Sequence, residues 1–198
     1  MASIAVVYHS GFGHTKKVAE HVTKGVRSQD ETKVELLSVE QLTDKDEANW
    51  AKLAAADGII FGAPTYMGGV SAPFKAFIDA ASRVWSRQGW RDKTAAGFTN
   101  SGSYSGDKLS ALIQLHINAM QHGMIWVGTG MLPGGDGKNY AGPNEINRIG
   151  SFSGLMTQGL QDSPDVTPGP GDLKTAELFG KRFAEVTQQF VRGRNGKY

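Results

Sequence analysis

Short apolar runs alternate with amphipathic helical patterns along this chain. Apolar runs that end in small, hydroxyl or glycine residues predict five strands, at 3–8, 33–37, 58–63, 94–99 and 124–127. Apolar residues at helical spacing predict the helices, at 14–29, 46–56, 73–85, 108–122 and 172–191. Because apolar strands that alternate with helices are typical of covered parallel sheets, we expect an α/β fold with a doubly wound, five-stranded parallel sheet in three layers. The glycine-rich segment 128–159 predicts a long insertion near the last strand.

The helical patterns also predict which side chains face the sheet. In the helix at 108–122, Leu109, Leu112 and Ile113 share one face. The last helix places four apolar residues at core spacing, which are Phe179, Phe183, Val186 and Phe190. We therefore expect all of these side chains in the core.

Length and composition are those of an ordinary globular domain. The chain has 198 residues, which suit one domain over 1–198, and a net charge of +2. It has no cysteine, so disulfides, thiolate nucleophiles and cysteine-bound metal centres are excluded. No apolar stretch would span a membrane and no secretory leader is visible, so we expect a cytoplasmic protein without a membrane partner. The basic residues near the C-terminus lack interleaved aromatics and predict a solvated tail, with no nucleic-acid partner.

The loop after the first predicted strand has the composition of a phosphate site. Ser10-Gly11-Phe12-Gly13-His14-Thr15 joins a strand to a helix, where backbone N–H groups and the positive end of the helix dipole converge. The P-loop pattern is absent, and Lys16 stands where a dinucleotide loop has its third glycine. A single terminal phosphate, as in a mononucleotide, therefore fits best. An ordinary turn with threonine as the helix cap is an equal alternative at this point.

Two further loops follow predicted strands and have unusual compositions. Residues 63–69 combine a rigid proline, a hydroxyl, large flat or soft side chains and two glycines, which suits a flat aromatic ring. Residues 100–107 are small and rich in hydroxyls, so their backbone amides can point at a ring edge. Because ligands of such sheets bind beyond the carboxyl ends of the strands, all three loops are expected at one site.

Five strings of residues together resemble the flavodoxin-like FMN proteins, and within them the WrbA-type NAD(P)H:quinone oxidoreductases. The strings are Ser10–Thr15, Gly62–Gly68, Phe77–Asp79 followed by Val84–Trp85, Phe98–Gly102, and His122–Met124. They agree with the family in order and spacing, and the resemblance covers residues 4 to 127. It implies a flavodoxin-like fold, FMN as cofactor, NADH or NADPH as co-substrate, a quinone-type acceptor and a homodimer or homotetramer.

The resemblance also implies a role for individual residues. The FMN phosphate would be held by Ser10, Gly11, Phe12, Gly13, His14 and Thr15. The isoalloxazine ring would be lined by Pro64, Thr65, Tyr66, Met67 and Gly68. Its pyrimidine edge would be bound by Asn100, Ser101, Gly102, Ser103, Tyr104 and Ser105. Phe12 would also border the nicotinamide and Trp85 the substrate, His122 would be the catalytic residue beside the flavin, and no metal site is expected.

Some features depart from the family or have a simpler interpretation. Tyr66 stands where members commonly carry arginine, the segment 38–58 is shorter, and no role is assigned within 128–159. His14 could cap its helix, and His122 could only complement a helix C-terminus. About 20 Å of helix separates His122 from the third loop, so its expected place beside a flavin predicts an oligomer that brings it there.

The implied mechanism needs no protein nucleophile, because the flavin carries the chemistry. Since no second nucleotide domain is visible, NAD(P)H and the oxidant are expected to use one open face in turn, by ping-pong kinetics. The alternatives are a flavodoxin-type one-electron carrier and an NAD(P)H-dependent FMN reductase. Carriers are usually acidic around the flavin, whereas the three loops contain only Asp107 as an acid. This favours the enzyme.

Overall fold

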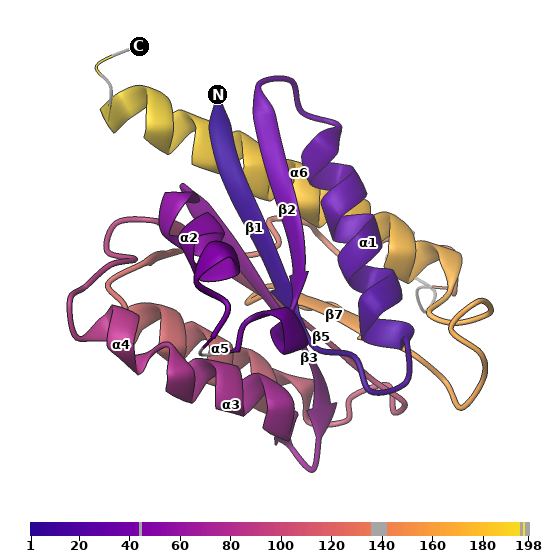
Figure 1. The fold of residues 1–198 in the computed structure, drawn as a ribbon. Coiled ribbons are helices and arrows are strands. Elements are labelled where there is room, and N and C mark those ends of the chain that lie inside the picture. The colour runs from indigo at the N-terminus through magenta and orange to yellow at the C-terminus, as the bar shows by residue number, and fades with distance from the viewer. Residues whose placement is uncertain (44, 136–141, 195, 197–198) are drawn as a thin grey trace.

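The computed structural model describes residues 1–43, 45–135, 142–194 and 196. A parallel sheet forms its centre, with the order β2-β1-β3-β5 and a fifth position beside β5 (Figure 1). The main strands are β1 (Ala2–Tyr8), β2 (Thr32–Ser38), β3 (Gly58–Tyr66) and β5 (Thr94–Ser101). The predicted doubly wound parallel sheet is confirmed.

The fifth position of the sheet is shared by two short strands. β6 (Ile125–Trp126) pairs with the first residues of β5, and β7 (Leu155–Gln158) pairs with its last four. The predicted insertion therefore lies within the last strand position and interrupts it, and residues 136–141 of the insertion lie outside the described part. This arrangement matters for the site because the chain that leaves β7 emerges at the carboxyl edge of the sheet.

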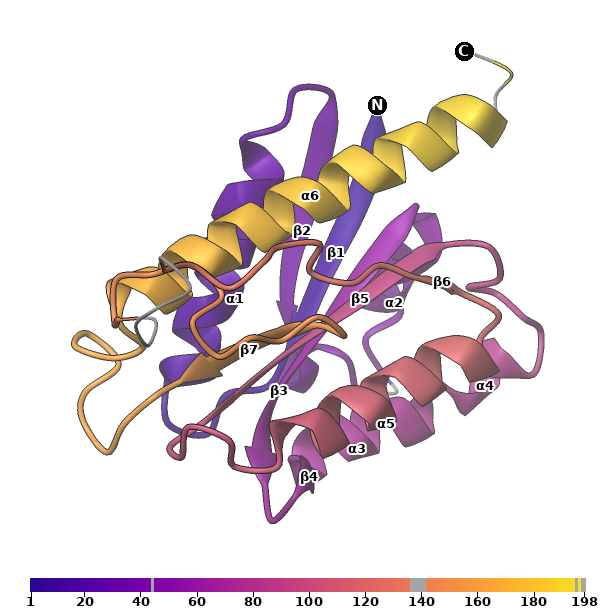
Figure 2. The same cartoon turned by 180° about the vertical axis from the view of Figure 1, so that it is seen from behind.

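Helices cover both faces of the sheet, as Figures 1 and 2 show. One face carries α1 (His14–Arg27) and the long α6 (Pro170–Arg194), which pack against each other. The other carries α2 (Glu47–Ala55), α3 (Ala72–Ala80), α4 (Ser82–Trp85) and α5 (Lys108–Gln121), and a short 3₁₀ turn, η1 (Val39–Gln41), precedes α2. The structure divides the single helix predicted at 73–85 into α3 and α4. The break falls at Ala81, whose ψ of −8° departs from the α-helical value of about −42°.

A buried apolar cluster lies on each side of the sheet. Beneath α1 and α6 it includes Val22, Phe98, Phe179 and Phe183. On the opposite side it is dominated by aromatic rings, which are Trp50, Phe61, Phe74, Phe77 and Trp90. The two clusters fix the positions of the strands and so of the loops that follow them.

The structure corrects part of the predicted core. Leu109 and Ile113 are 50% and 46% exposed, and so is Phe190, at 45%. The face of α5 that packs on the sheet instead carries Leu112 and Leu115. The prediction was wrong because α5 is apolar on two sides, so periodicity alone could not tell which side meets the sheet. No helix in the described residues is both long and apolar enough to cross a membrane.

Candidate functional site

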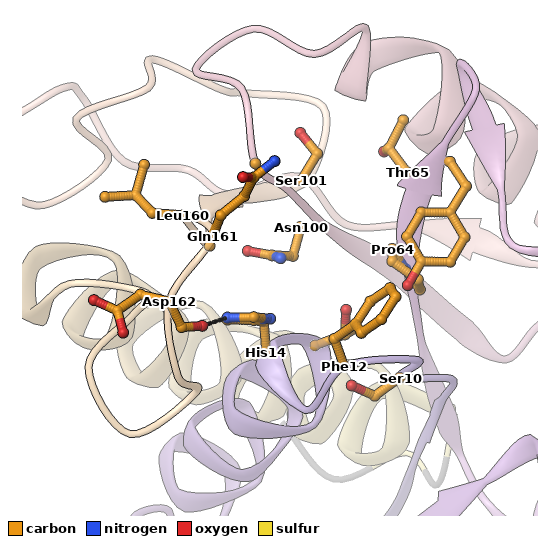
Figure 3. Close-up of a pocket in the computed structure, with 14 residues that line it drawn as sticks. Ser10, Phe12, His14, Pro64, Thr65, Asn100, Ser101, Leu160, Gln161 and Asp162 are labelled. Atoms are coloured by element: carbon orange, nitrogen blue, oxygen red, sulfur yellow. Dashed lines mark hydrogen bonds between the residues drawn. The ribbon is translucent and has the colours of Figure 1, made fainter.

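A pocket of about 610 Å³ opens at the carboxyl edge of the sheet (Figure 3). It lies where the strand order reverses between β1 and β3, the usual ligand position in such folds. Ten of the residues expected at the site line it: Ser10, Phe12, His14, Thr15, Pro64, Thr65, Tyr66, Asn100, Ser101 and Gly102. The chain after β7 adds four that the sequence analysis did not identify: Gly159, Leu160, Gln161 and Asp162.

The loop after β1 is shaped to bring backbone close to a ligand. Gly13 adopts a left-handed conformation with φ 91°, and its amide donates a hydrogen bond of 3.0 Å to Ser10 Oγ. A Cβ at Gly13 would lie 2.8 Å from Pro164 Cγ, so both backbone and space require glycine. A Cβ at Gly11 would lie 2.6 Å from the Tyr66 hydroxyl.

The start of α1 offers a row of free donors. The amides of Gly11, Phe12, His14, Thr15 and Lys16 donate to no acceptor in the part of the chain that the structure describes. These N–H groups, together with the α1 dipole, form a site for an anion. The fit to a phosphate rests on these amides and on the hydroxyls of the same loop, since the pocket lining contains neither lysine nor arginine.

His14 closes one side of the pocket. Its Nε2–H donates to the Asp162 carbonyl at 2.8 Å, the dashed contact in Figure 3. Gly159 lies tightly between two pocket residues, because a Cβ there would approach Asn100 Nδ2 to 2.8 Å and the His14 ring to 3.0 Å. The chain after β7 is therefore part of the pocket wall, and glycine at 159 lets it approach.

The loop after β3 presents only its first half to the pocket. Thr65 Oγ1 hydrogen bonds to Thr99 Oγ1 at 2.7 Å, which ties the β3 and β5 loops together. Tyr66 meets Phe12 edge to face, with ring centroids 6.4 Å apart, and burial raises the pKa of the Tyr66 phenol. Beyond it, Met67 and Gly68 have φ 48° and 76° and form a two-residue hairpin turn to β4 (Gly69–Val70).

This turn points away from the pocket, and the structure does not bring Met67 and Gly68 to the lining. The Met67 side chain is fully exposed at the tip of the hairpin. Gly11 and Gly13 also lie outside the lining, although their backbone belongs to the loop that forms it.

Only the first residues of the loop after β5 line the pocket. Asn100 is 5% exposed, and its Oδ1 accepts a hydrogen bond of 2.9 Å from Thr157, which leaves its Nδ2–H groups for the pocket. Ser103, Tyr104 and Ser105 do not line the pocket. The Tyr104 hydroxyl donates instead to the backbone carbonyl of Arg148, whose guanidinium lies 5.5 Å from the Tyr104 ring centroid.

His122 and Trp85 lie away from this pocket. His122 directly follows α5, which runs from the carboxyl edge of the sheet toward its amino edge in Figure 2, and Trp85 ends α4. His122 is 2% exposed, and its ring centroid is 4.4 Å from that of Trp90. The His122 ring is therefore packed in the core against Trp90 and does not line the pocket. Trp85 is half-exposed at the same edge and does not line the pocket.

The geometry matches a flavin nucleotide in chemistry as well as in place. Phosphate donors lie at the start of α1, and the apolar Phe12, Pro64, Tyr66 and Leu160 provide flat contact area. No group of three or more metal-ligating side chains occurs among the described residues. The free amides at one end of the pocket and the flat apolar walls at the other fit an organic phosphate-bearing ligand.

Comparison with known proteins agrees with this description. The family model for NADPH-dependent FMN reductase matches residues 8–137. The chain is 40% identical over 189 residues to flavodoxin FldP of Pseudomonas aeruginosa (96% of this chain, 98% of that one). It is 31% identical over 207 residues to an NAD(P)H dehydrogenase (quinone) of Archaeoglobus fulgidus (96% and 99%).

A solved structure gives the same result. The crystal structure of the flavodoxin, WrbA-like protein from Agrobacterium tumefaciens superposes with a TM-score of 0.72 at 38% identity and covers 96% of this chain and 99% of that one. The resemblance inferred from the five strings is thus confirmed. This chain belongs to the flavodoxin-like FMN proteins of the NADPH-dependent FMN reductase family.

Proposed function

We propose that residues 1–198 form one FMN-binding domain that transfers hydride from NAD(P)H to quinone-type acceptors. The observation that carries this proposal is the pocket at the switch point between β1 and β3, with free amides at one end and flat apolar walls at the other. A relative from Archaeoglobus fulgidus named NAD(P)H dehydrogenase (quinone) supports the same activity.

The phosphate end of FMN would be held by the loop from Ser10 to Thr15. Its free amides and hydroxyls would donate to phosphate oxygens, and Thr15, which is 2% exposed, would contribute a hydroxyl from within the first turn of α1. A phosphate held by neutral donors and a helix dipole needs no lysine or arginine.

The ring end would lie between the β3 and β5 loops. Pro64 and Tyr66 would contact its face, while Asn100 Nδ2 and the backbone after it would donate to its polar edge. FMN, when bound, supplies the hydride-accepting and electron-donating chemistry of the reaction. Phe12 is 76% exposed at the mouth, where it would stack on the nicotinamide or the acceptor and exclude water.

A flavodoxin-type one-electron carrier is the second candidate, because FldP of Pseudomonas aeruginosa is named a flavodoxin. Charge around the pocket favours the enzyme. Asp162 is the one acidic residue of the lining, so the rim lacks the strong negative field that steers carriers to basic partners. The single open pocket would admit NAD(P)H and the acceptor in turn, which gives ping-pong kinetics.

Steady-state kinetics of the FMN-loaded protein test this proposal. We expect NAD(P)H oxidation with benzoquinone to give parallel double-reciprocal plots, with little one-electron-reduced flavin during stepwise dithionite reduction. Phe12→Ala should raise KM for both substrates and keep FMN bound, whereas Phe152→Ala, which removes an exposed ring outside the pocket, should leave kinetics unchanged. Negligible turnover with an abundant, stable one-electron-reduced form would establish the carrier instead.

The expected homodimer or homotetramer stays a prediction, as does the cytoplasmic location. α5 has no charged residue after Lys108, and its outer face exposes four apolar side chains, Leu109, Ile113, Ile117 and Met120. A second copy packed there would bury apolar surface without separating an ion pair, and the molar mass in solution would reveal it.

A further inference from the structure

Lys108, the first residue of α5, is a buried cation behind the β5 loop. It is 1% exposed, and its Nζ has no carboxylate within ion-pair distance among the described residues. It donates instead to three successive backbone carbonyls, at 2.5 Å to Ser103, 2.8 Å to Tyr104 and 3.4 Å to Ser105. A buried lysine without an ion pair is rare because desolvating the ammonium is costly, so this arrangement calls for an explanation.

The hydrogen bonds of Lys108 set the direction of the loop amides. The Gly102 carbonyl accepts from Gln158 Nε2 at 3.1 Å, so the four carbonyls of 102–105 are all engaged by the protein. In a trans peptide the N–H points opposite to the preceding C=O. The amides of 104–106 therefore point away from the ammonium, and that of Ser103 points away from Gln158 Nε2. None of the amides of 103–106 donates to an acceptor in the described part of the chain.

A loop with its carbonyls turned toward a cation and its amides turned outward is a donor surface for electron-rich atoms. This loop continues directly from Asn100, Ser101 and Gly102 in the pocket wall. The pocket lining itself holds no lysine or arginine, whereas the Lys108 ammonium lies directly behind this loop.

Two further charged groups act on the ammonium in opposite directions. Asp172 on α6 is buried and paired with Arg148, at 2.7 Å to the guanidinium Nε and 2.9 Å to Nη2. Burial lowers the pKa of Lys108 to about 8, while the Asp172 charge raises it and the Arg148 charge lowers it. Three carbonyl oxygens around Nζ accept hydrogen bonds, which is the environment of a protonated amine with three N–H donors.

We propose that Lys108 is a positioning residue for the bound cofactor: its ammonium holds loop 103–106 with the amides of 104–106 outward, and its charge favours reduced FMN over oxidised FMN. The inference rests on the proposed function, since it takes FMN as the ligand. Positive charge near the reduced ring is a recognised means of tuning a flavin.

The absence of cysteine elsewhere in the chain allows a direct test. Lys108→Cys can be alkylated in denaturant and refolded, either with bromoethylamine, which restores an ammonium at the same reach, or with iodoacetamide, which gives a neutral side chain. The measurements are the dissociation constant of FMN and its midpoint potential. Lys93→Met is the matched control, because Lys93 also donates to backbone carbonyls, those of Ala54 and Ala56, but at the amino edge of the sheet.

We expect the aminoethylated protein and Lys93→Met to match the wild type. The neutral form should bind oxidised FMN about tenfold more weakly and reduced FMN about a further tenfold more weakly, which lowers the two-electron potential by about 30 mV. Equal affinity and potential in the two alkylated forms would overturn the proposal. Failure of the wild type to bind FMN would refute the proposed function instead. The wild type is measured first, so the two failures are distinguishable.

Amide hydrogen exchange of the wild type covers the case in which the neutral form does not refold. The amides of 103–106 should exchange rapidly without FMN and become protected when it binds. If they stay unprotected in the FMN complex, the loop does not donate to the cofactor and the proposal fails.

Discussion

Gly180→Ala should destabilise the protein by about 3 kcal/mol or more, because α1 and α6 cross in backbone contact at this residue. A Cβ at Gly180 would lie 2.0 Å from the Val22 carbonyl oxygen, and one at Gly25 would lie 1.9 Å from the Glu177 carbonyl oxygen. The clash is with backbone, so the added methyl group can be accommodated only if the helices move apart. Such a shift would also disturb the start of α1, which carries the phosphate loop.

Gly193→Ala is the matched control on the same helix. A Cβ at Gly193 meets nothing within 4 Å, so this substitution should leave stability unchanged or raise it by up to about 1 kcal/mol through helix propensity. Urea unfolding of the three proteins measures the difference. A Gly180→Ala variant with the wild-type midpoint would contradict the described crossing of the two helices.

Acidification should cost the protein about 3 kcal/mol of unfolding free energy through His122 alone. Burial lowers the pKa of His122 from 6.5 to about 4, and its Nδ1 has no hydrogen-bond partner among the described residues. Below pH 6.5 the His122 side chain binds a proton in the unfolded chain, whereas in the folded chain it stays neutral down to about pH 4. Stability from this residue is therefore complete above pH 6.5 and lost progressively between pH 6.5 and 4.

His122→Leu isolates this contribution, since leucine neither titrates nor leaves a buried polar atom. Unfolding free energies of the wild type and the variant are compared at neutral pH and near pH 4. The wild type should lose about 3 kcal/mol more than the variant over this interval. Parallel pH dependence of the two proteins would show that His122 is not buried as a neutral ring.

The sequence predicted best what depends on local chemistry. Ser10 to Thr15 lies between a strand and a helix, so its composition alone indicated where free amides would gather, and the structure places them there. The order of strands and helices predicted the sheet, because β1, β3 and β5 are apolar runs that are buried as expected. The edge strand β2 differs, since Lys33 and Glu35 are exposed and only Leu37 is buried. Even the hairpin at Met67-Gly68 falls within a loop expected at the site, although its tip points away.

The sequence could not predict features that depend on long-range register. β7 is four residues long, and its pairing with β5 is what brings Gly159 and Asp162 to the pocket. A four-residue strand after a glycine-rich insertion gives almost no periodic signal. The one indication of this strand in the sequence is the pair of glycines that flank it, 154 and 159. A Cβ at either position would clash with residues of β5.

His122 and Trp85 show a different limit. Their expected roles came from resemblance, whereas the direction of α5 and α4 carries both to the amino edge of the sheet, away from the pocket. For His122 the sequence already indicated this distance, because a helix as long as α5 places its two ends about 20 Å apart. Helix direction is therefore a better guide to these two residues than the motif that contains them.

Titration of the apoprotein with FMN and with FAD tests the central claim most directly. In the proposed function, the free amides and hydroxyls of residues 10–16 hold one terminal phosphate, and His14 and Asp162 close the pocket beside them. FMN should therefore bind at one site and more tightly than FAD, and Thr15→Val should weaken it by about 1.5–3 kcal/mol through loss of one charge-assisted hydrogen bond. FAD binding as tight as FMN binding, or no change in Thr15→Val, would contradict the account.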